Sequence, residues 1–212
     1  MLFKKESWEN YFNLRKINKV IRFLTISDIL IVSGLGLVAP IFAVFITESI
    51  KGGTLEVIGI ASAVYLLTKS LGQIPIASII DKSKGKKDDF WAMFIGSVIF
   101  SIVPLFYLVI SSPIELYIVQ FFYGLSAAII FPSWMAIFTR HIDKKHEAIE
   151  WGVYQTLADL GSAGAALLGG FLAFRFGFTS LFIIVSITCF IGSMFLVVIY
   201  KQMKTGNILF RN

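Results

Sequence analysis

Three ionisable residues, Asp28, Lys69 and Asp159, occur within long apolar stretches of this 212-residue sequence. A charged side chain at the centre of a bilayer costs about 2.5–3.5 kcal/mol on insertion scales. Such residues therefore usually face a cavity or a partner, and they mark the routes of substrates or protons. Gln73 follows Lys69 by four residues and Gln155 precedes Asp159 by four, so each charge should share a helix face with an amide. We expect these five residues to line a pathway for a small-molecule substrate and protons.

Two chemical roles are open for Lys69 and Asp159. In the first, Asp159 takes up and releases a proton, while Lys69 binds an anionic group or neutralises Asp159. In the second, the two side chains form a static buried ion pair with a structural role. Both residues lie near the membrane midplane, roughly 16 Å (Lys69) and roughly 12 Å (Asp159) from one end of their spans. Asp28 lies only a turn or two inside its span, where it can instead meet Arg22 or a lipid headgroup.

The stretches that carry these charges are each long enough to cross a bilayer, which takes about 20 apolar residues. The chain is 57% hydrophobic and 15% charged, and its mean hydropathy is +0.81, whereas soluble domains carry about 25% charged residues. Backbone groups in lipid must be satisfied internally, and strict alternation is lacking, so helices are predicted rather than a barrel. The six predicted spans are 29–47, 57–80, 90–114, 116–139, 151–174 and 176–200.

The orientation of the spans follows from the basic residues. Of the 19 Lys and Arg residues, sixteen lie on the side of the N-terminus and two, Lys51 and Arg175, on the other. By the positive-inside rule, both termini are cytoplasmic in a cell or inner membrane. The net charge of +6 therefore indicates topology rather than binding of nucleic acid. We divide the chain into a cytoplasmic segment 1–20, whose residues 7–20 form an interfacial helix or a plain basic anchor, a transmembrane domain 21–200 and a cytoplasmic tail 201–212.

The six spans divide into two sets of three. Lys69 and Gly72 in the second span are matched by Asp159 and Gly161 in the fifth, at an offset of about 90 residues. Because three is odd, the second set would have inverted topology. Inverted 3+3 repeats within a six-helix half are the architecture of the major facilitator superfamily. We therefore predict an all-α membrane protein of six transmembrane helices arranged as a 3+3 inverted repeat.

Two local motifs resemble this superfamily. The family has a G-x-x-x-D-R-x-G-R-[RK] loop after its second helix. Here Asp81, Lys82, Gly85, Lys86 and Lys87 are similar to it, with Ala77 at the first Gly and one extra residue before Gly85. The resemblance implies a cytoplasmic gate at this loop, whereas a purely topogenic basic loop is the alternative.

The second motif lies in the fifth span. Its glycine-rich stretch resembles the family's G-P-x-x-G-G helix, although Ala165 and Ala166 replace Gly-Pro, which weakens the antiporter role tied to that motif. Packing of small residues between helices is the other explanation of the stretch. The glycines concerned are Gly161, Gly164, Gly169 and Gly170.

The resemblance covers one six-helix half, whereas transporters of this superfamily usually have twelve helices. We therefore expect a parallel homodimer, or a complex with a second six-helix half, that works as a secondary transporter of a small solute by alternating access. The strong charge asymmetry argues against an antiparallel dimer. A membrane scaffold or accessory subunit that does not transport is the alternative.

The residue patterns typical of metal binding, of hydrolytic catalysis and of nucleotide binding are not apparent in the sequence. His141 and His146 are five apart, which does not place them on one helix face as a metal pair, and no catalytic set of Ser, His and acid is apparent. A G-x-x-x-x-G-K-[ST] motif is absent as well. We expect no enzyme activity, metal or cofactor, and we expect membrane lipids as partners. The one cysteine, Cys189, leaves the redox compartment undetermined.

Overall fold

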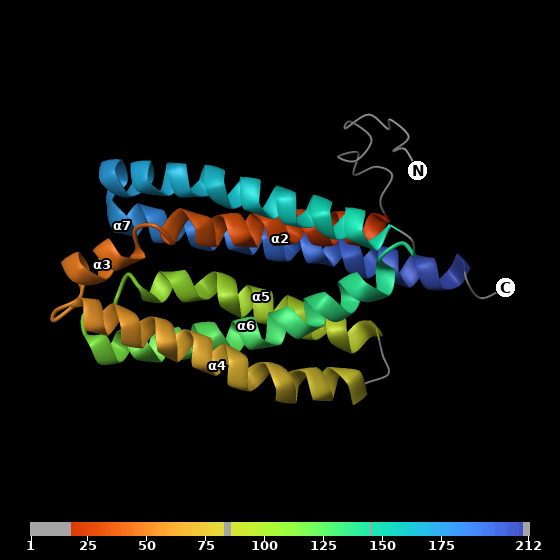
Figure 1. Ribbon diagram of the computed structural model, residues 1–212, viewed down its shortest axis with the longest axis horizontal. Helices are drawn as coiled ribbons and strands as arrows, with labels where there is room; N and C mark the ends of the chain where they lie inside the picture. Colours follow the sequence, from red (N-terminus) through yellow and green to blue (C-terminus); the bar gives the residue numbers. More distant parts are fainter. Residues whose placement is uncertain (1–17, 83–85, 145, 210–212) are drawn as a thin grey trace, which may run out of the picture.

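The computed structural model describes residues 18–82, 86–144 and 146–209, with the backbone alone at 86, 87 and 201–209. This part of the chain forms a bundle of long helices without strands (Figure 1). The predicted helix at 7–20, the gate residue Gly85 and the end of the tail fall largely or wholly outside the described residues. The all-α prediction is confirmed.

The first span is made of two helices. Helix α2 (Lys19–Val38) is capped by Asn18, whose side chain accepts a 2.9 Å hydrogen bond from the Val20 N–H. It ends just before Pro40, and α3 (Phe42–Ser49) follows after a short turn. Proline has no N–H with which to continue a helix. The continuous span predicted at 29–47 is therefore wrong at Pro40, and α2 also begins ten residues earlier than predicted.

The next three spans are single helices, α4 (Leu55–Lys82), α5 (Lys86–Phe106) and α6 (Pro113–His141). Pro75, Pro104 and Pro132 lie inside them without ending them. Glu115 caps the N-terminus of α6 by accepting hydrogen bonds from the backbone N–H groups of Ser111 (2.7 Å) and Ser112 (3.0 Å). These helices match the predicted spans to within a few residues, except that α5 ends at Phe106, earlier than expected.

Helix α7 (Glu147–Leu209) contains two spans. Gly177 has φ 75° and ψ 171°, which is not helical, and the chain turns back on itself at this point (Figure 1). Glycine adopts positive φ without the steric penalty of a Cβ atom. We call residues 147–176 and 178–209 the first and second halves of α7. Five helices are long and apolar enough to cross a membrane in the part of the chain described, and the turn in α7 makes six crossings.

The ends of the helices define two ends of the bundle. Helix α2 begins and α7 ends at the same end (Figure 1), as an even number of crossings requires. We call this the basic end, because Lys82, Arg140 and Lys144 lie there. At the opposite end, the Lys51 N–H donates a 3.0 Å hydrogen bond to the Ser111 carbonyl and so joins two turns.

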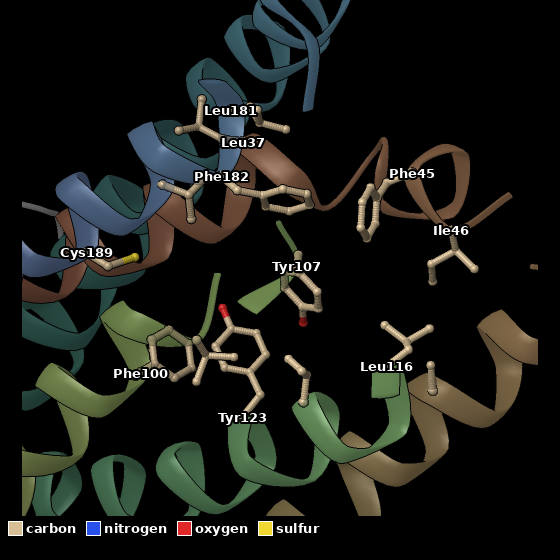
Figure 2. Packing of buried hydrophobic residues seen from close by; sticks show 14 of the residues in the cluster. Leu37, Phe45, Ile46, Phe100, Tyr107, Leu116, Tyr123, Leu181, Phe182 and Cys189 are labelled. Atoms are coloured by element: carbon tan, nitrogen blue, oxygen red, sulfur yellow. The ribbon is translucent and has the colours of Figure 1, made fainter. Parts of the chain in front are cut away.

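Packing in the bundle crosses between the two predicted sets of three. Helix α2 packs on both halves of α7, since Gly36 lies against Ser162 and Gly34 against Cys189. Helix α4 packs on α6, and α5 contacts α6 and α7. Two apolar clusters fill the interior. One cluster lies around Phe45, Tyr107 and Phe182, toward the end of the bundle away from the basic end (Figure 2). The other lies toward the basic end around Phe90 and Phe138. The inverted repeat itself remains a prediction.

Helix α4 and the first half of α7 are covered least by the rest of the chain. Only 6% of the apolar part of α4 is buried, and side chains such as Leu71, Ile74 and Phe174 are at least 74% exposed. Apolar surface of this extent is rare on soluble monomers and marks contact with lipid or with another protein. These two helices are therefore the outer elements of the fold.

Candidate functional site

A cavity of about 380 Å³ opens between α2, α3, α4, α5, α6 and the second half of α7. Its volume lies within the range of small-molecule sites. Apolar side chains such as Leu35, Phe42 and Val185 form most of its wall. Its polar groups come from the side chains of Ser62, Tyr65, Tyr107, Gln120 and Tyr123.

Two of the tyrosines project into the middle of the bundle from different helices. Tyr107 comes from the turn after α5 and Tyr123 from α6, and Figure 2 shows both hydroxyls directed toward the space between these helices. The Tyr123 ring is fixed by stacking on Phe100, at 4.4 Å between centroids. The amide of Gln120 lies close by in a residue that is 4% exposed.

The polar groups of the cavity are free to form hydrogen bonds with a bound ligand. Within the described part of the chain, the side chains of Tyr107, Gln120 and Tyr123 form no hydrogen bond with the protein. They can donate and accept hydrogen bonds but carry no charge at neutral pH. The cavity therefore suits an uncharged or amphiphilic molecule. The sequence did not indicate these residues, because tyrosines in apolar spans have no distinguishing pattern.

Lys69 lies on α4 beyond the cavity, toward the basic end. Its ammonium is 5.2 Å from the centroid of the Phe131 ring, which is a favourable cation–π arrangement. Gln73 follows one turn later, and both residues are half-buried. The aromatic ring partly compensates the charge, and the long side chain can still reach other acceptors.

Asp159 lies on the outer face of the first half of α7. The Gln155 amide donates a 2.9 Å hydrogen bond to its carboxylate, which confirms that this charge and its amide share a face. Both residues are exposed. Lys69 and Asp159 do not form an ion pair within one chain, because the one ion pair in the described part joins Asp89 and Arg140.

Asp28 links α2 to the first half of α7. Its carboxylate accepts a 2.7 Å hydrogen bond from the hydroxyl of Tyr154. The partner predicted for Asp28, Arg22, instead places its guanidinium 5.1 Å from the Phe23 ring centroid. Tyr154 also contacts Trp134, at 4.7 Å between ring centroids. Asp28 is therefore held by an aromatic partner in the bundle interior.

The predicted gate residues lie at the basic end. Asp81 and Lys82 are exposed at the end of α4. Lys86 and Lys87 begin α5, and their side chains, like all of Gly85, are outside the description. A gate at this loop remains a prediction.

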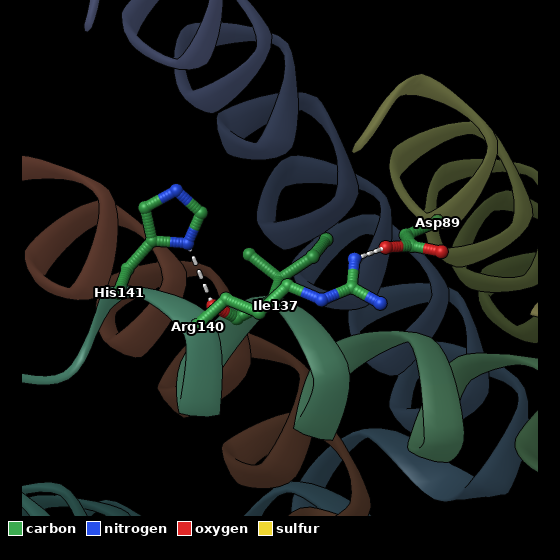
Figure 3. Close-up of polar contacts among 4 residues, drawn as sticks. All are labelled: Asp89, Ile137, Arg140 and His141. Carbon is green, nitrogen blue, oxygen red and sulfur yellow. Dashed lines mark hydrogen bonds and ion pairs between the residues drawn. The ribbon is translucent and has the colours of Figure 1, made fainter. Parts of the chain in front are cut away.

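An ion pair that the sequence analysis missed lies beside this loop. Arg140, in the last turn of α6, donates a hydrogen bond to the carboxylate of Asp89, in the first turn of α5 (Figure 3). Asp89 is completely buried, and its second carboxylate oxygen has no partner in the described part of the chain. The helix dipoles also stabilise both charges, because the acid lies at the start of α5 and the base at the end of α6. The pair ties α5 to α6 at the basic end.

The four glycines of the fifth span divide by environment. A Cβ atom at Gly161 would meet the Ser33 hydroxyl at 2.7 Å, and one at Gly169 would clash with the Leu37 carbonyl. These two glycines allow α7 to approach α2 closely. Gly164 and Gly170, by contrast, have no atom from elsewhere in the described part of the chain within 4 Å of the position of a Cβ atom. Packing among the described residues therefore does not explain them.

Comparison with known proteins places this fold and its apolar helices in one family. The family model described as Major Facilitator Superfamily matches residues 24–209. The chain belongs to the Major Facilitator Superfamily, a family of transporters. In a structural comparison, the crystal structure of the POT family transporter PepTSo aligns with a TM-score of 0.72 and 17% identity, over 86% of this chain and 37% of that one.

Two curated relatives are transporters by name. The proton-coupled antiporter flippase LtaA of Staphylococcus saprophyticus is 26% identical over 124 residues, which cover 55% of this chain and 31% of LtaA. An MFS-type transporter of Methanocaldococcus jannaschii is 25% identical over 162 residues, which cover 76% of this chain and 40% of the relative. The matched region thus spans about a third of the length of these relatives.

Proposed function

We propose that this protein is a secondary active transporter that moves a small amphiphilic solute in exchange for, or together with, protons. Transport would proceed by alternating access, in which one site opens to each side of the membrane in turn. The observation that carries the proposal is the cavity within a bundle of membrane-crossing helices, lined by apolar walls and by uncharged hydrogen-bonding groups.

The solute class follows from the lining of the cavity. The apolar part of a ligand would be stabilised by contact with walls formed by residues such as Phe42 and Phe182. A polar head group could form hydrogen bonds with Gln120, Tyr107 or Tyr123. Charged solutes would find no counter-ion among the residues that line it. An amphiphile with an uncharged head fits these conditions better than a sugar or an ion.

Proton coupling would use the carboxylates within the spans. Asp159 is exposed on the first half of α7 and, among the described residues, bonds only Gln155, so it can exchange a proton without breaking the fold. Asp28, tied to Tyr154, would place a second carboxylate nearer the basic end. The similarity to LtaA, which is named a proton-coupled antiporter flippase, supports coupling of this kind.

Assembly would complete the transporter. One copy supplies six crossings, and we propose a parallel homodimer or a complex with another six-helix unit, with the cavity facing the shared axis. The basic end would face the cytoplasm, as the distribution of Lys and Arg favours.

Proteoliposomes that contain the pH dye pyranine test the proposal. Short-chain monoacylglycerols and alkyl glucosides, at concentrations that leave the vesicles sealed, should each be tested for movement of protons under an imposed pH gradient. We expect solute-dependent proton flux with the unmodified protein and with Lys51→Ala, and at least tenfold less with Asp159→Asn. Flux equal to that of protein-free vesicles for every solute would contradict transport and favour a scaffold.

A further inference from the structure

Helix α5 carries an apolar stripe on a face that the rest of the described chain leaves open. Its members are three or four residues apart, which places them on one side of the helix. Each is between 42% and 53% exposed, whereas the neighbouring Phe90 is buried. We call these residues the α5 stripe: Trp91, Ile95, Ile99 and Ile102. Exposed apolar surface of this kind faces lipid in a membrane protein.

The second half of α7 carries a stripe of the same kind. Its exposed apolar residues are again three or four residues apart, and we call them the α7 stripe: Ile187, Phe190, Met194 and Val197. The helix continues beyond them to Leu209 at the basic end. The same spacing, carried forward along the helix, reaches Lys201 and then Lys204. The α7 stripe therefore changes from apolar to basic as it leaves the membrane.

The α5 stripe also ends in a lysine. Helix α5 begins at the basic end (Figure 1), and by helical register Lys87 lies one turn before Trp91 on the same side. The acids of this turn do not cancel the basic charge, because Asp89 is paired with Arg140 and only Asp88 is exposed. The three lysines at the ends of the two stripes outnumber that one exposed acid.

Aromatic rings join the two stripes where the charge begins. The Tyr200 ring lies 5.0 Å from the Phe90 ring and 6.0 Å from the Trp91 ring, between centroids. The Trp91 ring also lies 5.8 Å from that of Phe94. Trp and Tyr are enriched where a membrane protein passes from hydrocarbon to head groups. The junction of the stripes is therefore suited to the head-group level.

The length of the stripes fits one leaflet of a bilayer. Trp91 and Ile102 are eleven residues apart, which is about 16 Å along a helix. The hydrocarbon core of a bilayer is about 30 Å thick, so the α5 stripe spans about half of it. A soluble acidic protein could approach the lysines but not the stripes. An amphiphile with one negative end matches both parts of the surface.

We propose that the two stripes and their lysines form a binding site for an anionic phospholipid at the basic end. The acyl chains lie along the stripes, the glycerol region lies beside Trp91 and Tyr200, and the phosphate lies at the level of Lys87, Lys201 and Lys204. Basic pockets between helices on the cytoplasmic side bind anionic head groups in this way. The site is separate from the cavity and does not depend on the proposed transport.

Quenching of Trp91 by brominated lipids tests the site. Trp8→Phe, Trp134→Phe and Trp151→Phe leave Trp91 as the single tryptophan of the chain. Nanodiscs of phosphatidylcholine with increasing fractions of phosphatidylglycerol should carry bromine on the chains of one lipid or of the other. We expect phosphatidylglycerol to bind beside Trp91 at least about fivefold more tightly than phosphatidylcholine, the factor that one lysine near an anionic surface contributes.

Lysine substitutions separate this site from the general charge of the basic end. Lys87→Gln, Lys201→Gln and Lys204→Gln together should abolish the preference for phosphatidylglycerol. Lys144→Gln is the matched control, because Lys144 is exposed at the same end in the turn between α6 and α7, and it should leave the preference unchanged. Mass spectrometry of the phosphatidylglycerol that copurifies with a chain that keeps all its tryptophans gives the same comparison.

Three outcomes would overturn the proposal. The first is equal quenching of Trp91 by the two brominated lipids. The second is a preference, or an amount of copurified phosphatidylglycerol, that survives the three lysine substitutions. The third is displacement of the lipid by excess inorganic phosphate, which would identify a site for the free ion, whereas an unchanged preference supports the phospholipid. Neither readout requires proton flux, so the result is independent of the transport function.

Discussion

The Tyr154 hydroxyl donates a 2.7 Å hydrogen bond to the carboxylate of Asp28, which is 126 residues away in the sequence. The bond joins α2 to the first half of α7 in the interior of the bundle. We expect Tyr154→Phe and Asp28→Asn to be coupled, with an interaction energy of about 0.6 kcal/mol and at most about 1.7 kcal/mol, as for other hydrogen bonds between membrane helices.

A double-mutant cycle measured by unfolding in detergent checks this coupling. The pair Tyr154→Phe and Thr188→Val is a suitable control, because Thr188 bonds its own helix at Ile184. Effects of Tyr154→Phe and Asp28→Asn that are simply additive would show that the bond contributes nothing to stability.

Gly169 and Gly164 provide a second, matched comparison. Gly169→Ala would drive a Cβ atom into the Leu37 backbone of α2, and overpacking of this kind costs about 1–3 kcal/mol. Gly164→Ala meets open space and should change stability by less than about 0.5 kcal/mol. Thermal unfolding at a concentration dilute enough to keep the protein monomeric measures both. Equal losses for the two variants would contradict the close approach of α7 to α2.

Arg140 stabilises the buried carboxylate of Asp89. Arg140→Met removes its partner and should cost about 1–3 kcal/mol, because a buried acceptor is left unsatisfied. A compensating Asp89→Leu should recover part of the loss, since an apolar pair leaves no unmatched charge. Denaturation in detergent measures these changes, with Arg175→Met in the exposed turn as the control. If Arg140→Met unfolds like the control, the pair has no structural role.

The proposed orientation can be tested in intact cells. Cysteines at Lys51 and at Arg175, introduced in a Cys189→Ala background, should react with a maleimide that does not cross the membrane. A cysteine at Lys144, at the basic end, should react only after the cells are opened. Labelling of Lys144→Cys in sealed cells would place the basic end outside and contradict the positive-inside assignment.

The number and order of the spans could be predicted because each span requires a long apolar run. The turn at Gly177 could be predicted as well, because the apolar stretch around it is too long for a single crossing. The break after α2 was less accessible to sequence reasoning. Pro40 lies at that break, whereas Pro75, Pro104 and Pro132 lie within continuous helices. The residue type alone therefore does not distinguish a kink from an end.

The candidate site was predicted only in part. Lys69 and Asp159 were identifiable because charges in apolar runs are costly, and the bond from Gln155 to Asp159 followed from helical spacing. The cavity residues Tyr107 and Tyr123 were not identifiable, because they meet only through packing of separate helices. Arg140 was counted only among the basic residues that set the orientation, and Asp89 was not singled out, because fifty-one residues separate the two in the sequence.

Alternating access is the central claim, and labelling of two cysteines on one face of α4 tests it without a known solute. Ser62 lines the cavity, and Ala77 lies further toward the basic end. Reaction rates of Ser62→Cys and Ala77→Cys with a water-soluble maleimide should be measured in nanodisc dimers, with and without Asp159→Asn to mimic the protonated state. The account predicts that this change raises one rate and lowers the other. Rates that stay constant, or that rise and fall together, would contradict it.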